Sequence, residues 1–185
     1  MAAVQPDFFA AWTPEAGRRP ADFTVRPGAP EDVEACVHLA VAIGAGSVTR
    51  WRGTLTRTIR DGQERALFVA EAAGAVVAYG RVVLFRPDPA TPDPAPRGWY
   101  LLGLVVDQAW RRRGIGEALT IARMAWVAGR ADRIYYFTAD ENQASQELHR
   151  RLGFVPLDGA WIPPGGAPAD AGRQRFYCAL LAAER

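Results

Sequence analysis

Three consecutive arginines and two glycines stand where an apolar segment gives way to a helical pattern. Residues Arg111 to Arg113 precede Gly114 and Gly116, and apolar residues at helical spacing begin at about Ile115. The first N–H groups of a helix have no intrahelical partner and carry partial positive charge, so this point in the chain suits an anion. The glycines leave room for a phosphate to approach the backbone, and guanidinium groups can bind its oxygens in pairs. The pattern predicts a phosphate site, with a solvated basic turn as the alternative.

A second group of polar residues lies on one face of a later helical segment, from about Glu141 to Leu152. Asn142, Ser145 and His149 are three and four residues apart, so they share that face with apolar neighbours. Polar groups on an inward helix face need partners, and a bound substrate or cofactor is one kind of partner. In the structural alternative, His149 bonds to a backbone carbonyl and Asn142 only caps the helix.

The strands and helices around these residues must position them. Residues 99–106 are apolar on both faces, which is typical of a central strand covered by helices on each side, and Gly103 within them indicates a bulge or a close approach. The helix after the glycine turn ends near Gly129 and leads to a strand at 133–138, which should run parallel to 99–106. Asp140 and Gln143 have the spacing of a capping box that opens the next helix.

The remaining segments complete a mixed sheet. We expect strands at 23–26, 66–72 and 75–85, helices at 31–40 and 48–60, and a late pair of strands at 154–157 and 174–181. The expected fold class is α/β: a mixed, mostly antiparallel twisted sheet with one parallel strand–helix–strand crossover, flanked by helices. Residues 1–21 should form an N-terminal extension and residues 22–185 a single domain.

Composition limits the class of protein. A chain of 185 residues, 49% hydrophobic and 23% charged, fits an ordinary globular domain, and its formal net charge of +2 lacks the broad basic footprint of a nucleic-acid binder. Cys36 and Cys178 have no metal-ligand spacing with His38 or His149, so we expect no metal and no disulfide. Without a signal pattern or a run of about 18 apolar residues, we expect a cytoplasmic protein with no membrane or nucleic-acid partner.

Two motifs in this order resemble the GNAT superfamily of N-acetyltransferases. The family's acetyl-CoA signature is Gln or Arg, two residues, Gly, one residue, and Gly or Ala, and it is matched by Arg111, Gly114 and Gly116. The family's second segment is matched by Asn142, Ser145, Leu148-His149 and Gly153-Phe154. The resemblance extends from residue 23 to about residue 181 and implies the GNAT fold.

The resemblance implies an acetyltransferase that uses acetyl-CoA as its co-substrate and no metal. The backbone of the glycine turn would hold the CoA pyrophosphate, and the pantetheine arm would lie between strands 101–106 and 133–138. The residues implied in cofactor binding are Leu104, Val105, Val106, Arg111, Arg112, Arg113, Gly114, Ile115, Gly116, Glu117, Asn142 and Ser145.

The resemblance also implies direct acetyl transfer to a primary amine, with the oxyanion held by a backbone N–H near Val106. The position of His149 is often a tyrosine in the family that protonates the departing CoA thiolate, and histidine can do the same. The family often places a glutamate base on the strand before the glycine turn, but residues 99–106 contain no acid. The incoming ammonium must lose its proton to a water relay or to another group, for which the candidates are Asp140, Glu141, Tyr136 and His149.

The acetyl acceptor is expected to be a small-molecule amine between two long loops, 86–97 with five prolines and 158–172. These loops carry acidic and aromatic side chains, namely Asp88, Asp93, Asp158, Asp170 and Trp161. Such walls suit a cationic amino sugar, and the family resemblance includes aminoglycoside-modifying enzymes, so an antibiotic acetyltransferase is the specific expectation.

Other classes remain open. Acetylation of protein N-termini or lysines is one alternative, and a non-catalytic acyl-CoA-binding module is another. A dinucleotide-binding Rossmann domain is disfavoured because the glycine turn comes late and no acid-terminated second strand follows at the required spacing. The oligomeric state stays open, and a homodimer is one alternative.

Overall fold

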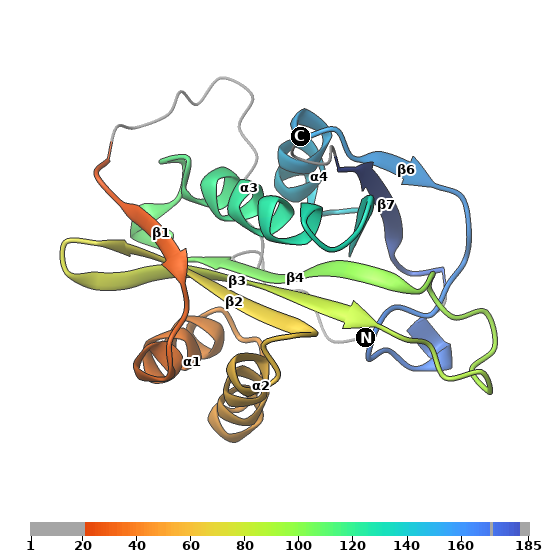
Figure 1. Ribbon diagram of the computed structural model, residues 1–185, viewed down its shortest axis with the longest axis horizontal. Coiled ribbons are helices and arrows are strands. Elements are labelled where there is room, and N and C mark those ends of the chain that lie inside the picture. Colours follow the sequence, from red (N-terminus) through yellow and green to blue (C-terminus); the bar gives the residue numbers. More distant parts are fainter. Residues whose placement is uncertain (1–20, 171, 182–185) are drawn as a thin grey trace.

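A seven-stranded sheet forms the centre of the molecule (Figure 1). The computed structural model describes residues 21–170 and 172–181, so nearly all of the expected N-terminal extension lies outside the described residues. The strands are β1 (Thr24–Pro27), β2 (Arg65–Ala72), β3 (Ala75–Phe85), β4 (Gly98–Val106), β5 (Arg133–Thr138), β6 (Val155–Leu157) and β7 (Arg175–Leu180). Their order is β1-β2-β3-β4-β5-β7-β6, and all neighbours are antiparallel except β4 and β5. The expected fold class is confirmed.

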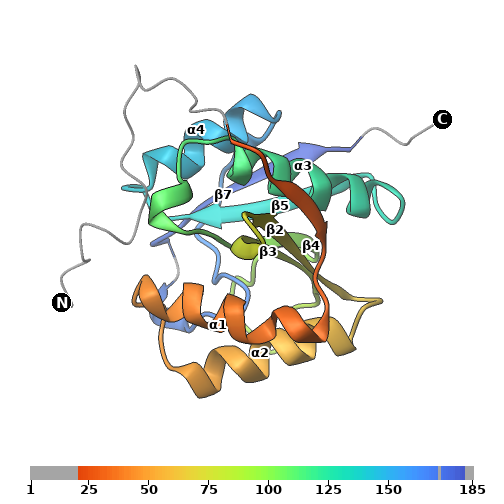
Figure 2. The same cartoon turned by 90° about the vertical axis from the view of Figure 1, so that its left-hand side faces the viewer.

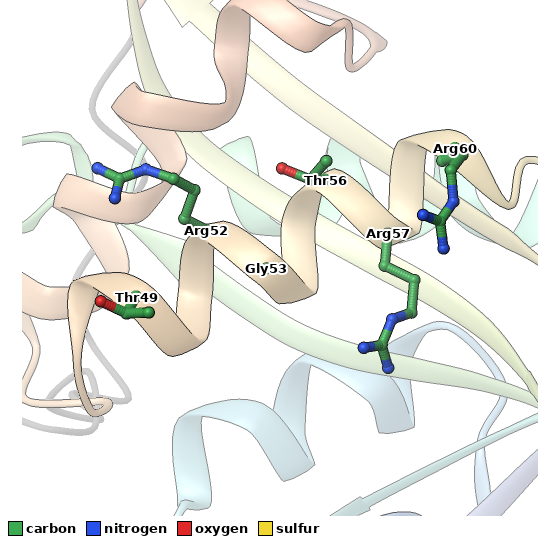
Figure 3. Close-up of a pocket in the computed structure, with 6 residues that line it drawn as sticks. All are labelled: Thr49, Arg52, Gly53, Thr56, Arg57 and Arg60. Atoms are coloured by element: carbon green, nitrogen blue, oxygen red, sulfur yellow. The ribbon is translucent and has the colours of Figure 1, made fainter.

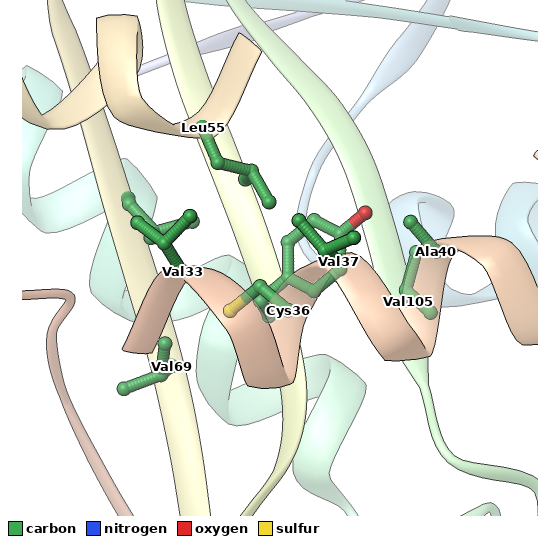
Figure 4. Close-up of a cluster of buried hydrophobic side chains, with 9 residues drawn as sticks. Val33, Cys36, Val37, Ala40, Leu55, Val69 and Val105 are labelled. Carbon is green, nitrogen blue, oxygen red and sulfur yellow. The ribbon is translucent and has the colours of Figure 1, made fainter. Parts of the chain in front are cut away.

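Helices cover both faces of the sheet (Figure 2). On one face lie α1 (Val33–Ala42) and α2 (Val48–Arg60), and on the other lie α3 (Ile115–Ala128) and α4 (Gln143–Arg151). Three 3-10 turns complete the regular structure: η1 (Pro30–Asp32), η2 (Gln108–Trp110) and η3 (Pro168–Asp170). Figure 4 shows how Val37 of α1 and Leu55 of α2 meet Val69 of β2 and Val105 of β4 in a buried, mainly apolar cluster. This packing fixes α1 and α2 against the first half of the sheet.

β4 and β5 separate soon after they meet. Their paired position is Tyr100 with Tyr135, although β4 continues to Val106 and β5 continues to Thr138. The ends of the two strands therefore lie beside a gap in the hydrogen-bonded sheet.

A β-bulge in β4 accompanies this separation. The register with β3 shifts between Tyr79, which faces Val105, and Arg81, which faces Leu102. Gly103 lies in the bulge with φ +58° and is exposed, although it belongs to a central strand. The expected bulge is confirmed, and its stronger local twist favours the divergence of β4 from β5.

The two long loops cover the part of the α1–α2 face that the helices leave bare. The loop of residues 86–97 joins β3 to β4, and residues 158–174 join β6 to β7. The backbone of Ala95 donates to Ile162 O (3.0 Å), and Ile162 N donates to Asp93 O (2.9 Å). Beneath the loops, Tyr100 and Tyr135 stack with ring centroids 5.2 Å apart. Each loop is thus held partly by the other.

The helix α4 begins later than expected. Its N-cap is Asn142, whose Oδ1 accepts a hydrogen bond from Ser145 N (3.2 Å), so the prediction of a capping box at Asp140 and Gln143 is wrong. The chain first makes a turn, in which Asn142 N donates to Ala139 O (3.1 Å), and this turn leaves the carboxylate of Asp140 free to pair with Arg175 of β7.

A buried arginine joins α3 to β3. Arg123 is 1% exposed, and its guanidinium donates to Leu119 O (3.1 Å), Arg81 O (3.3 Å) and Thr120 Oγ1 (2.9 Å). Gly80 of β3 makes room for it, because a Cβ added at Gly80 would lie 2.8 Å from Arg123 Cζ. The close approach of helix and sheet here requires a residue without a side chain.

We expect Gly80→Ala to lower the free energy of unfolding by about 1–3 kcal/mol, because the methyl group must displace an enclosed guanidinium or the strand itself. The measurement is urea unfolding followed by circular dichroism. Gly53→Ala is the matched control, since a Cβ at Gly53 of α2 meets nothing within 4 Å and alanine favours a helix by about 0.5–1 kcal/mol. Equal stability of the Gly80 variant and the wild type would contradict the packing argument.

Candidate active site

The glycine turn between β4 and α3 has the backbone shape of an anion site. Asp107 opens it, with Oδ1 accepting from Ala109 N (2.8 Å), and η2 follows. Arg112 (φ +63°) and Gly114 (φ +84°) are both left-handed, and Gly114 is the N-cap of α3. Left-handed residues next to a helix start turn successive N–H groups toward one point. The predicted phosphate site therefore has a suitable backbone.

Two of the turn's arginines fold back onto the turn itself. Arg111 Nε donates to Val106 O (3.3 Å), and Arg113 Nη2 donates to Ala109 O (3.4 Å) while its guanidinium lies 4.9 Å from the ring centre of Trp110. These contacts brace the turn, so the backbone N–H groups at the start of α3 are its main anion-binding feature.

Gly116 brings the turn against both β4 and α4. A Cβ at this position would lie 3.5 Å from Leu104 and 3.7 Å from Leu148. The two sequence motifs therefore meet in space, as their order in the chain suggested, and they do so beside the gap between β4 and β5.

His149 of α4 is enclosed by aromatic rings. It is 3% exposed, and its imidazole stacks on Tyr136 of β5 with centroids 3.7 Å apart and meets Phe154 edge-on. Nδ1 lies 2.8 Å from Ser145 O and so donates to it, which leaves the lone pair on Nε2. Nε2 is buried without a hydrogen-bond partner among the described residues.

Burial sets the protonation of His149. Loss of solvation lowers the pKa of the imidazole to about 3, outweighing the hydrogen bond to Ser145 O, and the nearby Arg123 lowers it further. At neutral pH, His149 is uncharged and presents an acceptor at Nε2. The bond from His149 to a backbone carbonyl, which a purely structural role predicts, is therefore present. The ring also begins any reaction without a proton on Nε2 to donate.

The other candidates for proton transfer differ in environment. Burial raises the pKa of Tyr136, so its phenol stays protonated, and its hydroxyl has no partner within the described residues. Asp140 and Glu141 are exposed, and the carboxylate of Asp140 is paired with Arg175. The structure therefore brings Tyr136 and His149 together but commits Asp140 elsewhere.

Three polar residues near the bulge were missed in the sequence. Tyr79 and Arg81 lie on the α1–α2 side of β3, and Arg123 lies on the other side of the same strand. Burial and the neighbouring Arg81 lower the pKa of Arg123 to about 9. The available signal was Gly80, because an isolated glycine in a strand indicates a close approach by another group.

A separate hollow of about 360 Å³ lies on the exposed side of α2 (Figure 3). Its lining consists of Thr49, Arg52, Gly53, Thr56, Arg57 and Arg60. Two of its arginines are already paired, Arg52 with Glu34 (2.6 Å) and Arg60 with Asp61 (3.2 Å). The hollow contains no acid, histidine or nucleophilic thiol, so it lacks the groups that acetyl transfer would use.

Two further findings concern the part of the chain that the structure describes. It contains no cluster of three potential metal ligands. No described helix is both long enough and apolar enough to cross a membrane.

This fold is found in N-acetyltransferases of known structure. Ribosomal-protein-alanine N-acetyltransferase from Brucella melitensis is 21% identical, with a TM-score of 0.66 over 85% of this chain and 99% of that one. The PaiA N-acetyltransferase from Thermoplasma acidophilum, solved in complex with coenzyme A, is 13% identical, with a TM-score of 0.63 over 86% and 99% of the chains. The ribosomal-protein-S18-alanine N-acetyltransferase from Escherichia coli is 16% identical, with a TM-score of 0.64 over 89% and 97%.

The chain belongs to the acetyltransferase (GNAT) family, whose model matches residues 38–154. It is an acetyltransferase with acetyl-CoA as its co-substrate. A search of curated protein sequences found no match to it.

The burial of His149 predicts how the stability of the protein depends on pH. An unfolded histidine titrates near 6.5, whereas the pKa of folded His149 is about 3, so between these values the unfolded chain binds a proton that the folded chain does not. Its contribution to stability is lost as the pH falls below about 6.5, by about 1.4 kcal/mol per unit. In His149→Phe, urea unfolding at pH 7, 6 and 5 should show a correspondingly smaller loss than in the wild type.

His38→Gln is the control, because His38 is exposed on α1. This variant should keep the wild-type pH dependence. The same slope in His149→Phe and the wild type would show that His149 is not held neutral by the fold.

Proposed function

We propose that the protein transfers acetyl directly from acetyl-CoA to a primary amine of a small polar molecule. The observation that carries this proposal is the gap between β4 and β5, which opens beside the glycine turn. The unpaired edge of β4 near Leu104 and Val106 would hydrogen-bond the amide groups of the pantetheine arm, as a neighbouring strand would. The oxygen of Val106 already accepts from Arg111 and has a second lone pair to offer.

In the same proposal, the backbone N–H groups from Arg112 to Glu117 hold the pyrophosphate at the start of α3. Asn142 contacts the arm through its side-chain nitrogen, since Oδ1 is used in capping α4. Ser145 lies one turn further along this helix, within 3.3 Å of His149 Nδ1. The donor would therefore lie between β4 and α4 and reach the bulge with its thioester end.

The chemistry proposed is attack of the free amine on the thioester carbonyl, formation of a tetrahedral oxyanion and departure of the CoA thiolate. A backbone N–H near Val106 stabilises the oxyanion. A water relay takes the proton of the ammonium, since β4 carries no acid and Asp140 is paired with Arg175.

His149 delivers a proton to sulfur only after Nε2 has accepted one, and the nitrogen of the tetrahedral intermediate, which carries an extra proton after the attack, supplies it. Negative charge developing on the thiolate raises the pKa of a neighbouring imidazole, which favours that step. The phenol of Tyr136, which is protonated and unpartnered, is the second donor available beside it.

The acceptor expected from the sequence was a cationic amino sugar between acidic loops. Two of the four acids bond within their own loops: Asp88 Oδ1 accepts from Ala90 N (2.9 Å) and Asp170 Oδ2 from Ala167 N (2.8 Å). Trp161 packs edge-on against Phe176 (5.3 Å). These contacts favour a role for these two acids and Trp161 in holding the shape of the loops. We therefore propose a small amine as the acetyl acceptor and do not specify an aminoglycoside.

A protein N-terminus is the second candidate acceptor. Two of the structural neighbours are named as ribosomal-protein-alanine N-acetyltransferases. An N-terminal alanine is also a primary amine on a small residue, so a peptide acceptor uses the same chemistry.

The cofactor site predicts a difference between two glycines at opposite ends of α3. Gly116→Ala should keep the fold, because its Cβ makes ordinary contacts with Leu104 and Leu148, but it narrows the space between β4 and α4. Calorimetry should show acetyl-CoA binding weakened by about tenfold or more, equivalent to about 1.4 kcal/mol. Gly129→Ala, where a Cβ meets nothing within 4 Å, should bind as the wild type does. Unchanged binding by both variants would place the arm elsewhere.

The proposed activity is tested by release of free thiol from acetyl-CoA over a panel of amino sugars, polyamines, amino acids and peptides beginning with alanine. We expect turnover with at least one small amine. Tight acetyl-CoA binding without turnover on any amine would leave the non-catalytic module as the better interpretation. On the best acceptor, His149→Phe should lower kcat far more than it weakens acetyl-CoA binding, because phenylalanine keeps the stack on Tyr136. Wild-type turnover would remove His149 from the mechanism.

A further inference from the structure

Arg81 of β3 lies on the sheet face that α1 and α2 cover in one part and the two long loops cover in another. On this face, Tyr79 packs in the cluster under α1 and α2, and Phe85 packs in the cluster under the two loops. Residues two apart in a strand share a face, so Arg81 lies where the helices end and the loops begin. It is half-buried at the boundary between the two layers.

The guanidinium of Arg81 has no paired acid within the part of the chain that the structure describes. Among the described residues, no carboxylate forms an ion pair with it, and its enclosed Nε has no hydrogen-bond acceptor. Its contact with the ring of Trp51, 5.2 Å from the centroid, positions the group without accepting a hydrogen bond. Enclosed cations are ordinarily paired, so a cation without a carboxylate partner among residues 21–170 and 172–181 suggests that a bound molecule supplies one.

Tyr79 supplies a second unpartnered donor on the same side of β3. Its side chain is fully buried, and its hydroxyl has no hydrogen-bond partner in the described part of the chain. Burial raises the pKa of this phenol, so it remains a donor at any physiological pH. Two donors that find no acceptor among the described residues therefore lie two positions apart on the same face of β3.

The bulge of β4 gives access to Arg81. Gly103 is exposed where β4 has parted from β5, and a Cβ there would lie 3.4 Å from both Nε and Nη2 of Arg81. The absence of a side chain at Gly103 leaves the guanidinium in reach of a molecule that occupies the gap. The acetyl group of the donor is proposed to arrive at the same bulge from the α3–α4 side.

We propose that Arg81, together with the hydroxyl of Tyr79, binds a carboxylate of the acetyl acceptor, so that the substrate is an amine that also carries a carboxylate. The inference rests on the proposed function and names its substrate class. A guanidinium offers parallel N–H groups that match the two oxygens of a carboxylate. Holding that end of the substrate orients its amine toward the thioester. A cationic amino sugar has no group of this kind to offer Arg81.

The test compares acceptors in matched pairs. The common α-amino acids, β-alanine and γ-aminobutyrate are each assayed beside their carboxamides, with thiol release from acetyl-CoA as the readout. We expect the best acid to exceed its amide in kcat/KM by roughly 10- to 100-fold, the range of one charged hydrogen-bonded contact. Arg81→Met should remove most of this preference by raising KM for the acid, with KM for acetyl-CoA unchanged. Tyr79→Phe should remove a smaller part.

Arg65→Gln is the control for the loss of a nearby cation. Arg65 lies on the neighbouring strand β2 and is already paired with Asp61 (3.5 Å), so the preference for acids should survive. Urea unfolding without ligand separates binding from structure. Replacing an unpaired enclosed charge with methionine should leave the protein at least as stable as the wild type.

The outcomes separate the inference from the proposed function. Equal use of acids and amides, an acid preference that survives Arg81→Met, or marked destabilisation by that substitution would overturn the carboxylate site. No turnover with any amine would overturn the proposed function instead. In that case, calorimetric titration of the same acids and amides into the CoA-loaded protein decides the inference. Binding of an acid that is lost in Arg81→Met supports the site, and equal or absent binding of acid and amide refutes it.

Discussion

The proposed active centre depends on two adjacent strands that stop hydrogen-bonding to each other. β4 and β5 are paired at Tyr100 and Tyr135 and then separate, so the backbone at the end of β4 has no strand beside it. Buried backbone groups require partners. Arg111 satisfies one of them at Val106 O, and the extended, amide-bearing arm of CoA is suited to the others. The bulge at Gly103 lies on the unpaired part of β4, which leads into the glycine turn, and Tyr136, on which His149 stacks, lies on β5.

Features that depend on residues close together in the chain could be predicted from the sequence. The hairpin of β2 and β3 follows from two apolar strands around Ala73-Gly74, and both turn residues have positive φ. The parallel placement of β4 and β5 follows from the helical crossover between them. The strand–turn–helix order at Gly114 is likewise local, and its motif gave the family that the comparison confirmed.

Features that depend on contacts between distant residues could not be predicted in this way. Asp140 has the spacing of a helix cap, but Arg175, on a strand added at the end of the chain, takes its carboxylate. His149 has the position of a proton donor, but the burial that holds it neutral comes from β5 and from Phe154. In the sequence, nothing distinguishes Arg81 from other arginines in strands. Its position becomes notable only when the packing of α1, α2 and the two loops beside it is known. The spacing of residues predicts on which face of a helix or strand a side chain lies. Its protonation state, and whether its donors and acceptors find partners, depend on how the helices, strands and loops pack together.

The mutual pairing of the two long loops makes them one covering unit, separate in the chain from the glycine turn and α4. The loop of residues 86–97 is stiffened by its prolines, and residues 158–174 are fastened to it at Pro94 and Ile162. Neither loop supplies a residue to the glycine turn or to α4. A change in the length of one loop disturbs the other before it disturbs the sheet, so the two are best exchanged together. Grafting both from another member of the family would therefore exchange this cover as one piece and leave β4 and the glycine turn unchanged.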